Sequence, residues 1–509
     1  MTNKNYIVAC DLGTGGNKAA LFAPNGECLA EHFAPYDTFF PKETFHEQRP
    51  QDWLDAVVSS VRSLMASVDV SPENVAAISI SGHSLGCVPL DAQGQLLQAA
   101  TPIWSDHRAS IEAEAFFTKV PEDEWYFTTG NGFPPVLYTV FKVMWLRQHA
   151  PEVFENTAAI VGTKDYVNFK LSGQLSTDYS YASGTGIYDL NKRSYDPRLL
   201  EASGLDGSLF LSPVASTDVI GTLTASASEA LGLPQSVKVI AGGVDNSCMA
   251  LGAGNVREGS VYHSLGSSSW LTVTTAQPVL DPRARPFVFA HVIPGMFNSA
   301  LSTFSSGTSL NWMRDLLTGV HGGDPISYDD LFRLAQTAPA GANNLLFIPT
   351  LAGGTMLEGG PNARGGLFGL SLSHTHADIL RATLEGIAFS LRIALDCLRS
   401  VAPVASEMIV VGGGAQNAFW RQIYADVYGM DIIKTNVDKN AGALGAAALG
   451  FVGTGIWEDF SPMLTIHKEL SRAEPRAAIA QHYQNRLEVF REVSEFAAKL
   501  GHNQVNLET

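Results

Sequence analysis

The sequence is poor in the features that mark disulfide-rich and nucleic-acid-binding proteins. It has 5 cysteines in 509 residues, and none forms a Cys-x-x-Cys pair, which argues against a disulfide framework or a cysteine-based zinc site. Lysine and arginine number 33 against 50 acidic residues, and the formal net charge is −17. Binding to a phosphate backbone needs a basic surface, so we expect no nucleic-acid partner. The composition favours a cytoplasmic enzyme without a structural metal ion.

Long apolar runs are also scarce. The uncharged stretch from Ala441 to Trp457 is rich in glycine and shorter than the roughly 20 apolar residues that a membrane-spanning helix needs. The apolar stretch before Asp11 is too short for the core of a signal peptide. We therefore expect no membrane partner. The apolar content of 45% suffices for at least two cores in a chain of this length.

Two common nucleotide-binding motifs are missing. The chain has no G-x-x-x-x-G-K-[ST] segment, which excludes the phosphate loop of the P-loop enzymes. The run from Gly412 to Asn417 has an asparagine where a dinucleotide fingerprint requires its third glycine, which argues against a Rossmann site. A nucleotide site in this chain must be built in another way.

What the sequence does have is a glycine-rich turn near its start. A strand-like run delivers Asp11 into the turn 13–16, and a second strand-like run follows through Lys18. Glycines let backbone N–H groups approach an anion closely, while Thr14 offers a hydroxyl and Lys18 a positive charge. The Asp11 carboxylate is suited to a hydrated Mg²⁺ ion. The alternative is an ordinary tight hairpin, because short glycine-rich matches are often accidental.

Two further glycine-rich elements lie downstream. The turn 266–268, Gly-Ser-Ser, separates two strand-like runs, so that two hairpins could hold one nucleotide between them. The second element, 412–417, follows another apolar strand and leads into a helix-like segment. We expect it to pack against an adenosine.

Strand-like and helix-like segments alternate along the chain, which is typical of α/β architecture. The strand-like runs are Tyr6 to Cys10, Ala76 to Ile80, Val237 to Ile240, Val261 to Leu265 and Glu407 to Val411. A long amphipathic helix is predicted over 377–399, after a capping box from Thr375 to Asp378. Because the phosphate-type hairpin recurs about halfway, we infer two domains of related design, with a boundary near 242–244.

Several motifs in the same order resemble the FGGY family of carbohydrate kinases. They are Asp11-x-Gly13-Thr14, Gly242-Gly243-Val244-Asp245-Asn246 and Gly366-Leu367-Phe368-Gly369-Leu370. Within the family the chain is most similar to the xylulokinases, through the segments 46–53, 104–108, 163–166 and 184–186. The likeness spans residues 6 to 460.

This resemblance implies two actin-like (ribonuclease H-like) domains with the active site in the cleft between them. We expect an N-terminal domain over 1–242 on the sugar side, a C-terminal domain over 243–470 on the ATP side, and a helical tail over 471–509. The resemblance also implies ATP and Mg²⁺ as cofactors and a small-molecule sugar as substrate. D-xylulose is the expected acceptor and D-xylulose 5-phosphate the product, and a homodimer is the alternative to a monomer.

Asp245 is the expected catalytic residue, since transfer to an alcohol needs a carboxylate near the nucleophilic hydroxyl. The alternative role of this side chain is to cap the helix that follows it. The expected nucleotide contacts are Asp11, which would hold Mg²⁺ through water, and Thr14, Lys18, Gly266, Ser267, Ser268, Gly307, Asn311, Gly413 and Asn417. The expected sugar contacts are Ser84, Leu85, Trp104, Asp106, Asp245 and Asn246.

The sugar side departs from the family pattern. Xylulokinases usually carry Gly-Gln-Met-His-Gly where this chain has Gly-His-Ser-Leu-Gly at 82–86, and His83 could face either the core or the sugar. Gly-Gly-Thr at 353–355 stands where many relatives have Gly-Glu-Arg, and Leu-Gly-Ser-Ser-Ser at 265–269 replaces the commoner Leu-Gly-Thr-Ser-Gly. A kinase for another sugar or polyol, such as ribulose, erythritol or a glycerol-like compound, therefore stays open. So does a sensor that binds ATP and sugar without phosphoryl transfer.

Overall fold

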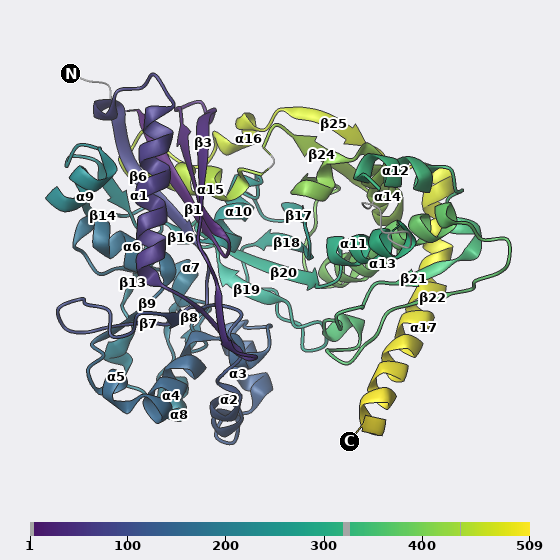
Figure 1. Ribbon diagram of the computed structural model, residues 1–509, viewed down its shortest axis with the longest axis horizontal. Coiled ribbons are helices and arrows are strands. Elements are labelled where there is room, and N and C mark those ends of the chain that lie inside the picture. Colours follow the sequence, from purple (N-terminus) through teal and green to yellow (C-terminus); the bar gives the residue numbers. More distant parts are fainter. Residues whose placement is uncertain (1–4, 319–325, 438, 509) are drawn as a thin grey trace.

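Two seven-stranded sheets organise the chain, one in each half (Figure 1). The computed structural model describes residues 5–318, 326–437 and 439–508. In Figure 1 the purple and blue first half lies to the left and most of the green and yellow second half to the right, with the yellow-green α15 (Ala441–Thr454) beside the strands of the first half. Among the described residues, no helix has both the length and the apolar character needed to cross a bilayer.

The first sheet has the strand order β14-β15-β6-β1-β2-β3, with β16 beside the end of β6. Its strands are β1 (Tyr6–Gly13), β2 (Gly16–Phe22), β3 (Cys28–Pro35), β6 (Val75–Gly82), β14 (Val219–Thr222), β15 (Lys238–Ile240) and β16 (Gly243–Val244). The first three strands form an antiparallel meander, whereas β6 runs parallel to β1 and β15 runs parallel to β6.

The second sheet has the order β19-β20-β18-β17-β23-β24-β25. Its strands are β17 (Val261–Leu265), β18 (Ser269–Thr275), β19 (Phe287–Ala290), β20 (Phe297–Thr303), β23 (Glu407–Val411), β24 (Asp431–Thr435) and β25 (Glu469–Ala473). Here β17, β18 and β20 are antiparallel, and β23 and β24 continue in parallel with β17. The central strands therefore repeat the order and directions of β3-β2-β1-β6-β15, which confirms the predicted fold class.

All five predicted strand-like runs are strands. β16 still belongs to the first sheet, and the second sheet begins only at Val261. The domain boundaries themselves stay a prediction.

The helices α10 (Asp245–Gly252) and α15 (Ala441–Thr454) lie between the two sheets (Figure 1). Side chains alternate between the faces of a strand. Ile7 and Ala9 of β1 pack with α10, α15 and Tyr262 of the second sheet. The two helices approach so closely that a Cβ added to Gly445 would lie 1.9 Å from the carbonyl oxygen of Cys248. Glycine at this position is what permits the contact.

The opposite face of the first sheet is covered by α1 (Pro50–Ala66) and α6 (Thr163–Ser172). Val8 and Leu12 of β1 pack there against Trp53 and Tyr166. A helical region between β6 and β14 adds α2 (Ser110–Phe117), α3 (Glu122–Thr129), α4 (Thr139–His149) and α7 (Tyr179–Ala182), with an aromatic core of its own.

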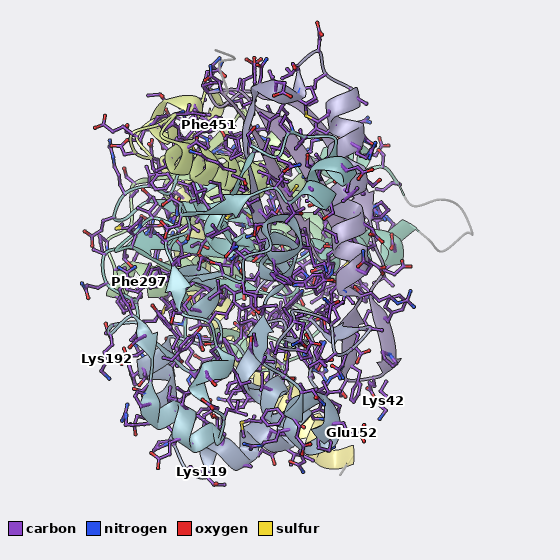
Figure 2. All side chains as sticks on the ribbon, turned by 90° about the vertical axis from the view of Figure 1, so that its left-hand side faces the viewer. Lys42, Lys119, Glu152, Lys192, Phe297 and Phe451 are labelled. Carbon is purple, nitrogen blue, oxygen red and sulfur yellow. The ribbon has the colours of Figure 1, made fainter. Side chains whose placement is uncertain are left out.

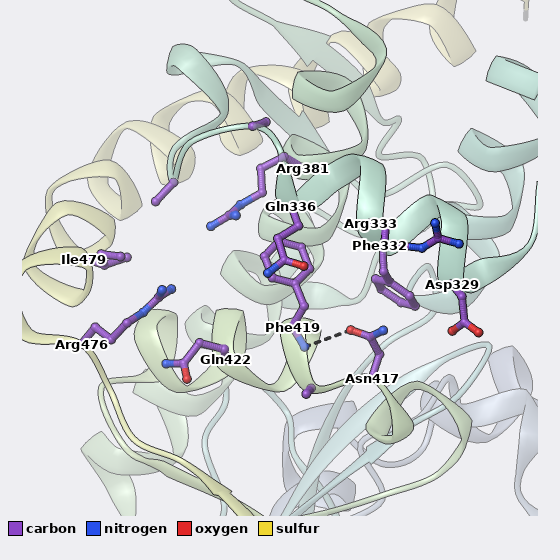
Figure 3. A pocket seen from close by; sticks show the side chains of 13 residues that line it. Asp329, Phe332, Arg333, Gln336, Arg381, Asn417, Phe419, Gln422, Arg476 and Ile479 are labelled. Atoms are coloured by element: carbon purple, nitrogen blue, oxygen red, sulfur yellow. Dashed lines mark hydrogen bonds between the residues drawn. The ribbon is translucent and has the colours of Figure 1, made fainter.

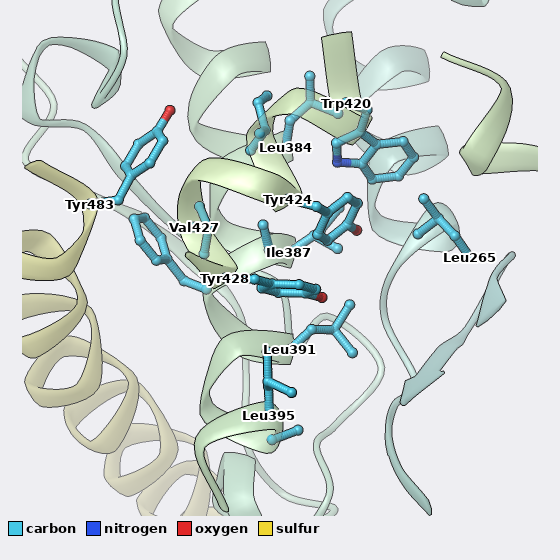
Figure 4. Packing of buried hydrophobic residues seen from close by; sticks show 14 of the residues in the cluster. Leu265, Leu384, Ile387, Leu391, Leu395, Trp420, Tyr424, Val427, Tyr428 and Tyr483 are labelled. Carbon is cyan, nitrogen blue, oxygen red and sulfur yellow. The ribbon is translucent and has the colours of Figure 1, made fainter. Parts of the chain in front are cut away.

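The second half is built around α13 (His376–Val401), which matches the helix predicted over 377–399. Its predicted capping box is present, because Asp378 Oδ2 accepts hydrogen bonds from the backbone N–H and the hydroxyl of Thr375, each at 2.8 Å. Leu391 packs with Tyr424 and Tyr428 of α14 (Ala418–Tyr428), as Figure 4 shows.

The predicted helical tail contains α17 (Ala477–Glu508), which packs into the same core through Tyr483 and Phe490. The remaining short strands are β4 (Phe39–Lys42), β5 (Phe45–Gln48), β7 (Val88–Leu90), β8 (Thr101–Pro102), β9 (Ala159–Val161), β10 (Thr177–Asp178), β11 (Tyr188–Asp189), β12 (Ser194–Tyr195), β13 (Pro213–Val214), β21 (Leu346–Ile348) and β22 (Gly366–Phe368). The remaining helices are α5 (Pro151–Glu155), α8 (Pro197–Ser203), α9 (Ala225–Leu231), α11 (Gly307–Thr318), α12 (Tyr328–Gln336) and α16 (Met463–Ile466).

Candidate active site

Asp11 lies near the end of β1, between Lys18 of β2 and Ser81 of β6. The Ser81 hydroxyl donates to Asp11 Oδ1 at 3.0 Å. Gly442 in the first turn of α15 packs against the same carboxylate, because a Cβ added there would lie 2.6 Å from Asp11 Oδ2. Burial raises the pKa of Asp11, although the charge of Lys18 and the hydroxyl of Ser81 act in the opposite direction.

Asp245 is the first residue of α10 and directly follows β16, which pairs with the end of β6. Its Oδ1 accepts the backbone N–H of Asn246 at 2.7 Å. Burial raises the pKa of Asp245 to about 7, and the charge of Asp11 acts in the same direction. The N-cap position belongs to Val244, so Asp245 does not take the predicted alternative role. A carboxylate with a pKa near neutrality can accept a proton at physiological pH.

A buried polar network fixes the backbone just before this aspartate. The N–H of Val244 donates to Ser180 Oγ at 2.9 Å, and that hydroxyl donates to Asp178 Oδ2 at 2.5 Å. Asp178 also pairs with the buried ammonium of Lys164 at 2.9 Å. In the sequence, the segment 163–166 carries only a family resemblance and has no pattern that indicates its role. The structure shows that its lysine supports the start of α10.

A pocket of about 380 Å³ lies in the second half, where the turn 266–268, α11 and the segment after β23 meet. Six of the predicted nucleotide residues line it: Gly266, Ser267, Gly307, Asn311, Gly413 and Asn417. They come from three separate parts of the sequence. The structure therefore brings together most of the predicted nucleotide contacts.

The turn at 266–268 is held by the N-terminus of α11. Gly307 N–H donates to the carbonyl of Gly266 at 3.1 Å, and Thr308 N–H donates to the carbonyl of Ser267 at 3.0 Å. A Cβ added to Gly307 would lie 2.5 Å from the Gly266 oxygen. Glycine is needed at 307 because the two backbones approach this closely.

The two predicted asparagines of the pocket also have structural partners. Asn417 Oδ1 accepts the backbone N–H groups of Phe419 and Trp420 at 3.0 and 3.1 Å and so caps α14. Asn311 Oδ1 accepts the hydroxyl of Tyr328. Both side chains are thereby fixed in orientation.

Four predicted nucleotide residues lie outside this pocket: Asp11, Thr14, Lys18 and Ser268. The Thr14 hydroxyl accepts the indole N–H of Trp104 at 2.9 Å, and Lys18 Nζ donates to the carbonyl of Lys439 at 2.6 Å. The first hairpin thus contacts the sugar side and the segment before α15. That both hairpins hold one nucleotide stays a prediction.

The predicted sugar residues differ in how accessible they are. Trp104 is 39% exposed, while Ser84 and Leu85 are buried and Leu85 has a positive φ of 60°. Asp106 is fully buried, and its Oδ2 accepts the backbone N–H of His46 at 2.7 Å. It also binds the guanidinium of Arg108 through two N–H groups at 2.8 Å each. Direct contact between Asp106 and a sugar stays a prediction.

His83 faces the core, which decides between the two orientations that the sequence left open. Its ring contacts Trp53 edge to face, with centroids 5.5 Å apart, and lies within hydrogen-bond distance of the Thr163 hydroxyl at 3.0 Å. Burial lowers the pKa of His83 to about 3, so the imidazole is neutral at physiological pH.

A larger depression of about 910 Å³ adjoins the smaller pocket across Phe332 and Asn417 (Figure 3). Its arginines, Arg333, Arg381 and Arg476, are each paired with a carboxylate. None of the described residues that line it belongs to a glycine turn. We therefore place the nucleotide site in the smaller pocket, where three backbone turns converge.

Comparisons with known proteins agree on one family. The model of the N-terminal domain of the FGGY family of carbohydrate kinases matches residues 6–252, and the model of its C-terminal domain matches 261–454. The chain is 29% identical to the xylulose kinase of Bacillus subtilis, with 96% of both chains covered. It is 30% identical to that of Haemophilus influenzae, covering 94% of this chain and 98% of the relative.

Solved structures show the same likeness. The xylulose kinase from Rhodospirillum rubrum matches 98% of this chain and all of its own, with a TM-score of 0.90 and 26% identity. A gluconate kinase from Lactobacillus acidophilus matches 97% of this chain and 98% of its own, with a TM-score of 0.89 and 27% identity.

Proposed function

Since the chain belongs to the FGGY family of carbohydrate kinases, we propose that it transfers the γ-phosphoryl group of ATP to a hydroxyl of D-xylulose, giving D-xylulose 5-phosphate and ADP. Family membership confirms the resemblance in the motifs and makes the protein a sugar kinase. The choice of D-xylulose is supported by relatives named xylulose kinase that match nearly the whole chain. The similar gluconate kinase supports a sugar acid as the second candidate.

The observation that carries the mechanism is the placement of Asp245. Its carboxylate is buried at the start of α10, is oriented by the N–H of Asn246, and has a pKa raised to about 7. As the acceptor oxygen forms its bond to the γ-phosphorus and the bond to the leaving ADP oxygen breaks, the hydroxyl proton passes to Asp245. A proton acceptor of this kind contributes about 10²- to 10⁴-fold to the rate.

The residues around Asp11 fit a hydrated Mg²⁺ ion. The carboxylate is buried, is held by the Ser81 hydroxyl, and lies close enough to Asp245 for its charge to raise the pKa of that residue. A nearby cation stabilises the ionised form of such a pair of carboxylates. Mg²⁺ is usually held by one or two carboxylates together with water and substrate phosphates, and Asp11 would hold it here. When bound, it would neutralise charge on the phosphate oxygens.

Backbone turns would bind the nucleotide. In the proposed complex the backbone N–H and the hydroxyl of Ser267 donate to the phosphates. The N–H groups of Gly266, Gly307 and Thr308 instead donate to carbonyl groups and hold the turn in shape. Gly413 and Asn417 border the adenosine, and Thr14 and Lys18 complete the phosphate site from the first hairpin. Trp104 offers the sugar an apolar plane beside Asp245 and Asn246.

The test is a coupled ADP-release assay with Mg-ATP across D-xylulose, D-ribulose, gluconate, erythritol and glycerol, run beside Asp245→Ala. We expect turnover on D-xylulose that the variant loses while it still binds ATP. Turnover on gluconate instead would move the substrate and keep the mechanism. ATP binding without turnover on any acceptor would refute the proposed function and favour a sensor.

A further inference from the structure

Lys142 in α4 is a buried cation that the proposed mechanism does not use. Its side chain is 1% exposed. The ammonium donates to three backbone carbonyls, those of Leu85 at 2.7 Å, Ile103 at 2.8 Å and Leu137 at 2.7 Å. A lysine ammonium has three N–H donors, so each is used. Within the described part of the chain, no carboxylate lies within ion-pair distance of it.

The three carbonyls belong to three different segments, two of which carry expected sugar contacts. Leu85 lies between β6 and β7 next to Ser84, and its φ of 60° is unfavourable for a leucine. Ile103 directly precedes Trp104. Leu137 ends the turn that leads into α4. One buried ammonium therefore ties both sugar-side loops to one helix.

The other charged and titratable groups around Lys142 do not tie the two sugar-side loops to α4. Asp106 is the main negative charge that acts on Lys142, but its oxygens bind Arg108 and the backbone of His46. Cys87 and Arg108 also face the ammonium: Cys87 raises the pKa of Lys142 and Arg108 lowers it. The charge of Lys142 in turn lowers the pKa of His83 and of His107. Burial lowers the pKa of Lys142 to about 7, although Asp106 opposes the shift.

We propose that Lys142 is a positioning residue of the sugar site, which sets sugar affinity by holding the loops of Leu85 and Trp104 without touching the sugar. This inference rests on the proposed function. A neutral amine has two N–H groups for three carbonyls, so deprotonation leaves one buried carbonyl without its donor. An unsatisfied buried acceptor is costly, and the strained backbone at Leu85 can then relax away from the conformation that the sugar needs.

The test is isothermal titration calorimetry of sugar binding to full-length Asp245→Asn from pH 6 to 8.5. This background removes the titration of the proposed base, and leaving ATP out of the sugar titration prevents turnover. The titrant is whichever acceptor of the panel gives the largest heat. We expect sugar affinity to fall about tenfold across this range, the size of one lost hydrogen bond to a charged group, while ATP affinity changes less than about twofold.

Adding Lys142→Met to this background should lower sugar affinity at pH 6 by about tenfold or more and abolish its pH dependence. The matched control is Lys119→Met. Lys119 also donates to a backbone carbonyl, that of Ala202 at 2.8 Å, but it lies at the outer end of the first half (Figure 2). Its replacement should leave sugar affinity within about twofold.

Three outcomes would overturn the inference. In the first, folded Lys142→Met binds the sugar within twofold of its parent. In the second, this variant loses sugar affinity and ATP affinity equally. In the third, the sugar affinity of the parent does not change with pH. The pH profile of the parent needs no substitution at residue 142, so it still tests the inference if Lys142→Met does not fold. Sugar binding without turnover by the wild-type enzyme would refute the proposed function alone, and the binding of no sugar would refute both.

Discussion

The two glycine-rich hairpins have the same strand arrangement but different surroundings. The β1-β2 hairpin carries Asp11 and Lys18 and contacts the N-terminal turn of α15. The β17-β18 turn contacts the start of α11 through backbone hydrogen bonds and through the hydroxyls of Thr308 and Ser269, and none of these involves a charged group. One hairpin is surrounded by titratable side chains and the other by backbone and hydroxyl groups. A repeated structural unit can therefore be specialised by what packs on its turn.

This contrast predicts that the two hairpins contribute to different steps of the reaction. The first half holds the two interacting carboxylates, whose pKa values are raised by burial. The pocket on the second half is lined by glycines and neutral side chains, with Asp329 as its one charged residue in the described lining. Changes beside the first hairpin should lower the rate of phosphoryl transfer, and changes beside the second should weaken ATP binding.

Replacing the proposed base gives the largest expected effect. Asp245→Asn should lower kcat by about 10²- to 10⁴-fold and leave the KM for ATP nearly unchanged. It should also stabilise the fold at pH 8. A carboxyl whose pKa is raised on folding contributes stability below its unfolded pKa, and this contribution is lost as pH rises through about 7. Steady-state kinetics and thermal unfolding at pH 5 and pH 8 would check both. Lower stability at pH 8 would contradict the assignment.

The pH dependence of the wild type tests how the two carboxylates interact. The ratio kcat/KM for the sugar should rise as pH increases toward about 7, because the base must be ionised in the free enzyme. It should fall again at higher pH, because Lys142 then loses its proton and sugar binding weakens. Asp11→Asn should lower kcat by about 10- to 100-fold. It should also move the rise to lower pH, since the charge of Asp11 raises the pKa of Asp245. An unshifted profile in Asp11→Asn would show that the carboxylates do not interact.

Gly442→Ala tests the contact between α15 and the first hairpin. Alanine favours a helix over glycine by about 1 kcal/mol, so a position without constraint would gain stability. Here the new Cβ would lie 2.6 Å from Asp11 Oδ2, and we expect kcat to fall by about tenfold as that carboxylate is displaced. Gly221→Ala in β14, where a Cβ has ordinary contacts at 3.4 Å, is the control. Equal activity in the two variants would argue against the constraint.

Removing a hydroxyl from the second hairpin should have the smallest effect. Ser267→Ala should raise the KM for ATP by about two- to tenfold, the worth of one neutral hydrogen bond, and leave kcat unchanged. Ser208→Ala, at an exposed position, serves as the control. A fall in kcat larger than the rise in KM would mean that this hairpin also acts on the transition state, and the contrast between the hairpins would fail.

Sequence patterns predicted those parts of the structure that are determined by residues close together in the chain. The α13 periodicity and its capping box at Thr375 and Asp378 follow from side chains within one turn. The glycine turns were recognisable because close backbone approach permits few other residues. The lining of the pocket was predicted partly from such turns, which include Gly266 and Gly413, and partly from the family resemblance, which implied Gly307 and Asn311.

Long-range contacts could not be read in the same way. Lys18 donates to a carbonyl 421 residues away, and Lys142 joins segments as many as 57 residues distant. A buried lysine has no sequence signature that separates it from an exposed one. The orientation of His83 was undecidable for the same reason, because it depends on Trp53 and Thr163 packing around the ring.

The position of α15 has a consequence for how the protein is made. One face of β1, with Ile7 and Ala9, is covered by a helix that begins at residue 441. A ribosome adding 5 to about 20 residues per second emits this strand tens of seconds before its cover. During that interval α10 (Asp245–Gly252) is the one of these two helices available to pack on this face. The face therefore stays partly uncovered, and the amino-terminal half cannot complete its folding before α15 is synthesised.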